Sequence, residues 1–169
     1  MGKTVEVVDM VVRKNGKSKS KNQSFNFFID RCKEIFKFLI DDYSMEVLEP
    51  EIYGFECSVT FRRYQELAVT IMYEAGTMPW VLFTAVTEVD GVLRNERFAL
   101  DYVIEERLPK FQIDKYEFGE QNEEKMKNVL LQYAKIIKEC CNDILEGDFS
   151  ILPKIRERRE SDQKKLNEE

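Results

Sequence analysis

The sequence predicts an α+β fold: an antiparallel meander sheet of three to five strands packed with an N-terminal and a long C-terminal helix. Two observations predict it. Apolar residues recur at helical spacing near both ends of the 169-residue chain, and they alternate with polar residues in its middle. Short polar links separate the alternating runs, and links of this length favour antiparallel neighbours.

The N-terminal helix is expected to begin at Ser24 and end near Tyr43. Its apolar residues follow the i, i+3, i+4, i+7 spacing of a helix with one buried face, while charged residues occupy the other face. Ser24 is a suitable N-cap because its hydroxyl can accept a hydrogen bond from an early backbone N–H. The apolar positions are Phe25, Phe28, Ile29, Cys32, Ile35, Phe36, Leu39 and Tyr43.

Three strands are expected between residues 55 and 86, and a further strand over residues 45–48. Residues 55–62 and 67–73 alternate between apolar and polar side chains, which predicts strands with one buried face. Residues 80–86 are almost all apolar, which predicts a central strand buried on both faces. We expect large aromatic side chains to fill the interface between helices and sheet, namely Phe25, Phe28, Phe36, Trp80 and Phe83.

The second half of the chain is expected to be mainly helical. Residues 100–108 have helical spacing, although alternate residues of the same stretch also suit a strand. A long amphipathic helix is expected over residues 126–144, with Gly147 at its C′ position. A last helix is expected from about Ile151.

One globular domain is expected over residues 24–155. Residues 1–23 are interpreted as a basic N-terminal segment with a flexible linker, and residues 156–169 as a charged C-terminal helical tail. The first residues lack the pattern of a secretory signal, and no apolar stretch is long enough to span a membrane. The four cysteines suit reduced core positions, so we expect a cytoplasmic protein without membrane association.

Charge is distributed unevenly along the chain, whose formal net charge is -6. Residues 1–23 hold six basic and two acidic side chains, whereas residues 24–150 hold 14 basic and 25 acidic ones. An acidic body repels phosphate backbones and attracts basic proteins, so nucleic acid is not expected as a partner. The alternative is that the acidity only maintains solubility.

Histidine is absent from the sequence, which excludes a Ser-His-Asp or Cys-His relay and His-ligated metals within the chain. There is no glycine-rich phosphate loop, and no carboxylate pair lies in an otherwise apolar segment. We therefore assign no catalytic residue, cofactor or metal ligand. The candidate cleft or interaction residues are Glu74, Trp80, Glu88 and Asp90.

These candidates have two interpretations. Glu74 ends an alternating strand, where it would face a cleft with Tyr73 and Trp80. Glu88 and Asp90 lie at another strand end and precede three further carboxylates. Together these oxygen atoms suit a divalent cation, but a solvated acidic face explains them equally well. The further carboxylates are Asp101, Glu105 and Glu106.

Three short motifs carry a resemblance over residues 24–155. They are the Phe-rich helix up to Tyr43, the Tyr73-Glu74 strand end, and the Tyr133-Ala134 helix that runs into Leu145-Glu-Gly-Asp-Phe149. This layout resembles a group of small, largely uncharacterised bacterial proteins, some of which are similar to immunity proteins encoded beside polymorphic toxins. The resemblance implies stoichiometric inhibition of a toxin without an active site. The lysine-rich start departs from the layout.

The sequence therefore favours a non-catalytic protein-binding module, and its most specific form is an immunity-type inhibitor of a basic toxin. The alternative is a small-molecule- or cation-binding protein, or a carboxylate-based enzyme, with a cleft beside the sheet. A homodimer with a scaffolding role is a third hypothesis.

Overall fold

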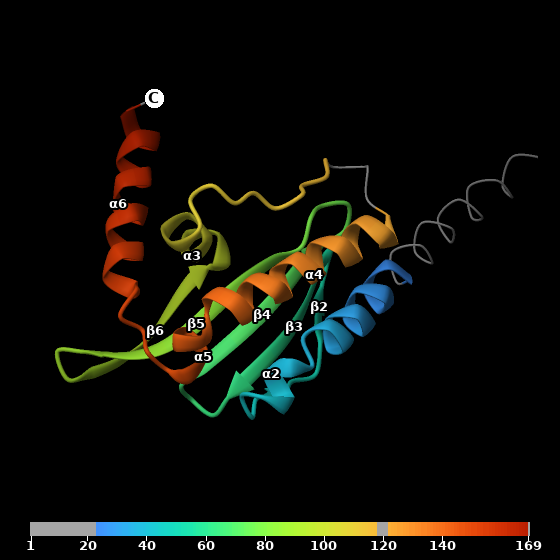
Figure 1. The fold of residues 1–169 in the computed structure, drawn as a ribbon, viewed down its shortest axis with the longest axis horizontal. Coiled ribbons are helices and arrows are strands. Elements are labelled where there is room, and N and C mark those ends of the chain that lie inside the picture. The colour runs from blue at the N-terminus through green and yellow to red at the C-terminus, as the bar shows by residue number, and fades with distance from the viewer. Residues whose placement is uncertain (1–22, 118–121, 169) are drawn as a thin grey trace, which may run out of the picture.

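An antiparallel sheet forms the centre of the structure (Figure 1). The computed structural model describes residues 23–117 and 122–168, so most of the basic segment expected over residues 1–23 lies outside the described residues. The described strands are β1 (Glu46–Val47), β2 (Glu51–Tyr53), β3 (Glu56–Arg63), β4 (Leu67–Glu74), β5 (Trp80–Val89) and β6 (Val92–Ala99). From β3 to β6 each strand pairs with the next, which confirms the predicted meander.

The edge of the sheet beside β3 is formed by two short segments. β1 and β2 both pair with β3, and β4 occupies the other side of that strand. Pro50 lies between the two segments, where its lack of a backbone N–H donor interrupts the pairing. The sheet thus has five strand positions, at the upper end of the predicted range.

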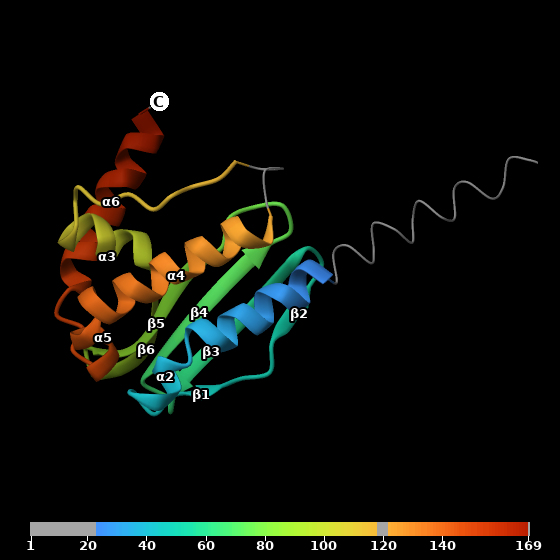
Figure 2. The same ribbon diagram turned by 45° about the vertical axis from the view of Figure 1, so that its right-hand side comes forward.

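Helices lie along one face of this sheet (Figures 1 and 2). A helix over residues 23–35 and α4 run across the strands' buried face, with α2 and α5 at their ends. The α+β class predicted from the sequence is therefore confirmed. The labelled helices are α2 (Phe38–Asp41), α3 (Leu100–Arg107), α4 (Glu123–Cys140), α5 (Asn142–Glu146) and α6 (Leu152–Glu168).

The N-terminal helix differs from its prediction in two respects. A turn at residues 36–37 divides it, so that α2 forms a separate short helix. Ser24 is not the N-cap, because residue 23 is already helical. The hydroxyl of Ser24 instead lies 3.0 Å from the phenol oxygen of Tyr73, which belongs to β4.

The long helix expected over residues 126–144 is also divided. α4 ends at Cys140 and α5 follows after one residue. The side chain of Asn122 caps α4 by accepting a hydrogen bond from the backbone N–H of Lys125 at 2.8 Å. Gly147 ends α5 with a φ of +98°, which confirms the predicted C-terminal glycine.

The core lies between the helices and the sheet, and it depends on strict alternation along the strands. Every second residue of β4, from Leu67 to Tyr73, is buried. The Tyr73 ring contacts Phe28 at a centroid distance of 5.1 Å and Phe25 at 5.9 Å. Aromatic contacts of this kind add to the gain from apolar burial, so helix 23–35 and β4 stabilise each other.

One expectation about the core was wrong. Phe25, Phe28, Phe36 and Phe83 are buried between the layers as predicted, but Trp80 lies on the opposite face and is only half-buried. The prediction that β5 is buried on both faces fails for the same reason. No described helix covers the second face, so its apolar side chains remain partly exposed.

Two arginines hold the end of α4 and the short helix α5 in place. Arg107 of α3 donates hydrogen bonds to the backbone carbonyl of Cys140 and to both carboxylate oxygens of Asp143, the latter at 2.8 and 2.5 Å. Arg63 of β3 donates to the backbone carbonyl of Leu145 at 2.6 Å. These charge-assisted bonds supply partners for carbonyl groups at the ends of α4 and α5.

α6 is attached to the sheet and to α3 through ion pairs. Arg156 binds Glu96 of β6, and Arg158 binds Glu105 and Glu106 of α3 at 3.1 and 3.2 Å. The boundary expected between residues 155 and 156 thus falls inside a continuous helix.

Replacement of Asp143 by Asn is expected to lower the free energy of unfolding by about 1 kcal/mol at pH 7, as for a partly exposed ion pair. The hydrogen bonds from Arg107 hold the pKa of Asp143 below its ordinary value. The contribution is therefore complete above about pH 3.9 and is lost as the pH falls through the lower pKa of the folded protein.

Urea unfolding of both proteins between pH 7 and about pH 2 measures this difference, which should shrink on acidification. Asp162→Asn is the matched control, because that exposed carboxylate lies 3.7 Å from Lys165. A difference that is the same at every pH would contradict the ion-pair explanation.

Candidate functional site

The candidate interaction surface is the face of the sheet that the described helices leave uncovered. Its side chains come from alternate positions of neighbouring strands, opposite in phase to the core. Between its charged ends, the face carries half-buried hydroxyl and apolar side chains, among them Ser58, Thr60, Thr70, Met72, Trp80, Leu82, Thr84 and Val86.

One end of this face is acidic and aromatic. The register places Glu56 of β3 directly opposite Glu74 of β4, and Tyr53 of β2 directly opposite Glu56. Glu51 and Trp80 extend the group by one position, opposite Ser58 and Met72 respectively. We call Glu51, Tyr53, Glu56, Glu74 and Trp80 the acidic end.

Local structure explains why these side chains are presented to solvent. Gly54 adopts a φ of +58° in the tight turn between β2 and β3, which lets the two strands pair directly. The β2 side of this hairpin lies at the edge of the sheet, so Tyr53 is 86% exposed. Edge position and hairpin geometry together give the acidic end an exposed aromatic ring beside its carboxylates.

The three carboxylates of the acidic end have no ion-pair partner among the residues that the structure describes. Arginines bind other glutamates of the chain, such as the exposed Glu46 and the partly buried Glu96. Like charges directly opposite each other on neighbouring strands are destabilising. The acidic end therefore has a negative electrostatic potential, and a cation that binds there would reduce the repulsion between its carboxylates.

The other end of the uncovered face carries basic residues. Arg62 of β3 and Arg97 of β6 lie in one row across the sheet, in which Ala68 and Thr84 fill the positions between them. Arg62 is ion-paired with Glu46 at 2.7 Å. We call Arg62 and Arg97 the basic end.

The structure brings together two of the four candidate residues. Glu74 and Trp80 both belong to the acidic end. Glu88 and Asp90 lie at the far end of β5 and in its turn to β6, eight or more residues from Trp80 and thus roughly 26 Å away. The expected cleft that Glu74 would share with Tyr73 and Trp80 is wrong as far as Tyr73 is concerned, because Tyr73 is buried on the helix-covered face.

The carboxylates of α3 do not join Glu88 and Asp90 in a cation site. Lys154 and Arg158 of α6 bind Glu106, and their hydrogen bonds lower its pKa. Arg158 also binds Glu105. In the described part of the chain, no group of three or more Cys, Asp or Glu residues is arranged to hold a metal ion.

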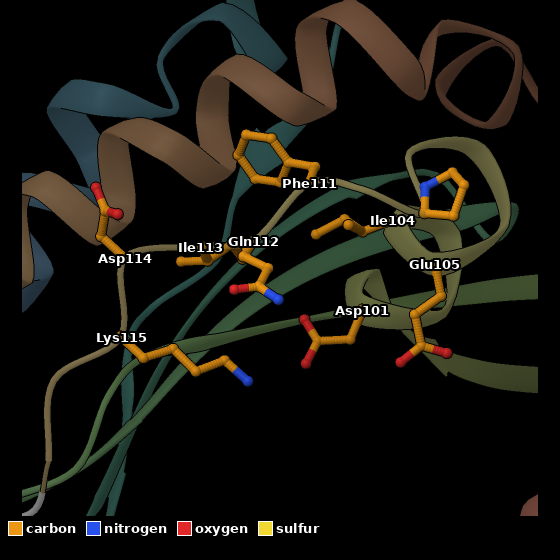
Figure 3. Close-up of a pocket in the computed structure, with 9 residues that line it drawn as sticks. Asp101, Ile104, Glu105, Phe111, Gln112, Ile113, Asp114 and Lys115 are labelled. Carbon is orange, nitrogen blue, oxygen red and sulfur yellow. The ribbon is translucent and has the colours of Figure 1, made fainter.

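A hollow of about 700 Å³ lies beside α3, and sequence reasoning did not foresee it. Figure 3 shows that Asp101 and Lys115 extend toward the same space from opposite sides. Apolar side chains of Ile104 and Ile113 form part of its lining, together with the exposed ring of Phe111. From the sequence we expect a loop over residues 110–119, of which 118 and 119 lie outside the described residues. A loop without periodicity gives no signal for such a hollow.

Three of the four cysteines are buried core residues, and Cys140 is partly buried against them. Burial raises the pKa of Cys57 to about 11 and that of Cys141 to about 12, so both thiols are neutral at physiological pH. Cys32 is fully buried and its pKa is raised as well.

Three tyrosines hold the turn between β4 and β5, which joins Glu74 to Trp80. The phenol of Tyr133 donates to the carbonyl of Pro79 at 2.9 Å, and that of Tyr116 donates to the carbonyl of Thr77 at 3.0 Å. Burial raises the pKa of both phenols. The Tyr73 phenol accepts a bond from the backbone N–H of Gly76 at 3.4 Å.

Sequence reasoning missed Glu51, Tyr53 and Glu56. A signal was present for Glu56, which occupies the polar phase of an alternating strand. Its position opposite Glu74, however, depends on the strand register, which the sequence does not specify on its own.

The chain has no match among protein-family models, curated proteins or solved structures. In the described regions, no helix combines the length and the apolar character required to cross a bilayer.

Replacement of Glu74 by Lys is expected to raise the free energy of unfolding by about 0.5 kcal/mol, because an attractive pair with Glu56 replaces a repulsive one. Urea unfolding at low salt measures the change. Glu88→Lys is the matched control, since it alters the net charge equally but lies opposite Leu93. Equal gains in both variants would show that only net charge matters.

Proposed function

We propose that the protein is a non-catalytic protein-binding module that binds a basic partner through its acidic end. The observation that carries this proposal is the set of exposed carboxylates without described ion pairs beside the exposed ring of Tyr53 and the half-buried ring of Trp80. Aromatic side chains are enriched in protein interfaces, and carboxylates select for basic groups.

A lysine or arginine of the partner fits this surface in a specific way. Its charged group would bind between Glu56 and Glu74, which lie opposite each other on neighbouring strands. Its aliphatic stem would pack on Trp80 or Tyr53, whose ring faces also attract cations. One basic side chain would thereby relieve the repulsion between the two glutamates.

Two features support binding rather than catalysis. The chain has no histidine, and the buried cysteine thiols are neutral at physiological pH. The carboxylates of the acidic end are exposed to solvent, where another protein can reach them.

The most specific form of the proposal is an immunity-type inhibitor of a basic toxin. The resemblance of the Phe-rich helix and the Leu145–Phe149 segment to such bacterial proteins supports it. The excess of acidic side chains in residues 24–150 supports it as well, because opposite charge accelerates association. In this form the protein would block its target by occupying a basic surface.

The second candidate function is binding of a small molecule in the hollow beside α3 (Figure 3). Its volume of about 700 Å³ lies within the usual range for ligand pockets, and charged and apolar groups both line it. A thermal-shift screen with metabolites tests this alternative, because a ligand that binds the folded state raises its melting temperature.

A decalysine peptide tests the main proposal by calorimetry. The peptide is expected to bind the wild-type protein and to bind a Glu56→Gln/Glu74→Gln variant at least tenfold more weakly, because that variant lacks both central carboxylates. The control variant, Glu123→Gln/Glu124→Gln, loses the same charge at the start of α4. Equal weakening in both variants would mean that the peptide reports net charge alone.

The same pair of variants applies to the natural target. Co-expression of the protein with the product of the adjacent gene, followed by affinity purification, should yield a complex that the Glu56→Gln/Glu74→Gln variant weakens and the α4 variant retains. Absence of any stable complex with that product would exclude the immunity-type form of the proposal.

A further inference from the structure

We infer that two copies of the chain associate through their uncovered sheet faces, in antiparallel orientation, so that Glu56 in the acidic end of each copy lies on Arg62 in the basic end of the other. This inference rests on the same surface as the proposed function and names a second occupant for it. Two features of the face support this association: the charge order along β3 and the apolar residues at its centre.

β3 alone is acidic at one end of the uncovered face and basic at the other. Its outward side chains are, in order, Glu56, Ser58, Thr60 and Arg62. Glu56 and Arg62 are six residues apart, which is roughly 20 Å along a strand. A two-fold axis in the plane of the interface and perpendicular to the strands reverses this order. Glu56 of each copy then lies opposite Arg62 of the other copy.

The centre of the face suits the same axis. Trp80 lies in one row with Met72, and Leu82 lies in the next row with Thr70. The axis passes between these rows, so Trp80 and Met72 of one copy oppose Leu82 and Thr70 of the other. Large side chains thereby meet smaller ones, as in two sheets that pack face to face about 10 Å apart.

Arg62 and Glu56 can each form an ion pair with a second copy in addition to their contacts within the chain. Arg62 donates to Glu46 through Nε and Nη2, at 3.3 and 2.7 Å, and its Nη1 group makes no hydrogen bond to a residue that the structure describes. Glu56 has Glu74 as its neighbour on β4. A guanidinium from a second copy that approaches Glu56 would therefore lie close to two carboxylates and reduce the repulsion between them.

Self-association and the binding of a basic partner would compete, since both use Glu56 and Trp80. A second copy supplies through Arg62 the positive charge that the partner would otherwise supply. The dimer would then be the form of the protein that exists before its partner is encountered.

Sedimentation equilibrium over a range of protein concentrations tests the inference. The wild-type chain should form dimers, and Glu56→Arg and Arg62→Glu should each raise the dimer dissociation constant at least tenfold, because each places like charges opposite one another. An equimolar mixture of the two variants should dimerise again, since both contacts in the mixed dimer join opposite charges. Circular dichroism verifies that each variant is folded.

Three controls separate the contact from other effects. Glu46→Gln removes the intrachain partner of Arg62 and should leave the dimer intact. Glu123→Arg changes charge on α4 and should also have no effect. Leu82→Arg should weaken dimerisation both by itself and when mixed with either charge variant, because it places a charge at the apolar centre of the interface.

A monomeric wild-type chain at all concentrations would overturn the inference, as would a mixture that does not recover. These results are distinguishable from failure of the proposed function. Arg62→Glu retains Glu56 and Glu74, so it should still bind the decalysine peptide as a monomer. Loss of the dimer with retained peptide binding would leave the proposed function intact. Failure of the monomeric Arg62→Glu variant to bind the peptide, with the wild-type chain still a dimer, would contradict the proposed function alone.

Discussion

Burial of one sheet face beneath the helices is the constraint on which the rest of the structure depends. The rings of Phe25 and Phe28 pack on Tyr73, and Phe83 stacks on Phe98 at a centroid distance of 5.2 Å. Because strand side chains alternate between faces, fixing the apolar phase beneath the helices directs the other phase outward. The exposed position of Glu74 thus follows from the burial of its neighbour in sequence.

Periodicity was sufficient to predict the fold class, because helical and strand spacing differ clearly over residues 24–43 and 55–73. It was not sufficient for β5. When both phases of a strand are apolar, the sequence does not show whether its second face is covered. In β5 that face is half-exposed, and Trp80 lies on it. Ser24 shows a second limit, since its hydroxyl has the chemistry of a cap but contacts Tyr73, 49 residues away. Glu74 was predicted as a site residue from the sequence. Its neighbour Glu56 was not, because its position opposite Glu74 depends on the register between β3 and β4.

The acidic character of the chain divides into two kinds of carboxylate. One kind is neutralised within the fold, as where Arg107 binds Asp143 and Arg156 binds Glu96. The other kind includes Glu56 and Glu74, for which no described cation is in range. A net charge read from the sequence cannot distinguish them, although only the second kind contributes fully to a long-range potential. The proposed recognition of a partner therefore depends on the position of the carboxylates without an ion-pair partner among the described residues, and not on the net charge of the chain.

The tyrosine contacts to the turn over residues 75–79 have a consequence for the entropy of binding. Three phenols hold the turn that links Glu74 to Trp80, and two of them donate directly to backbone carbonyls. A surface that is already rigid loses little conformational freedom when a partner arrives, so more of the interaction energy appears as affinity. Buried residues such as Tyr133 thereby restrict the conformation of an exposed binding surface through the turn that they hold.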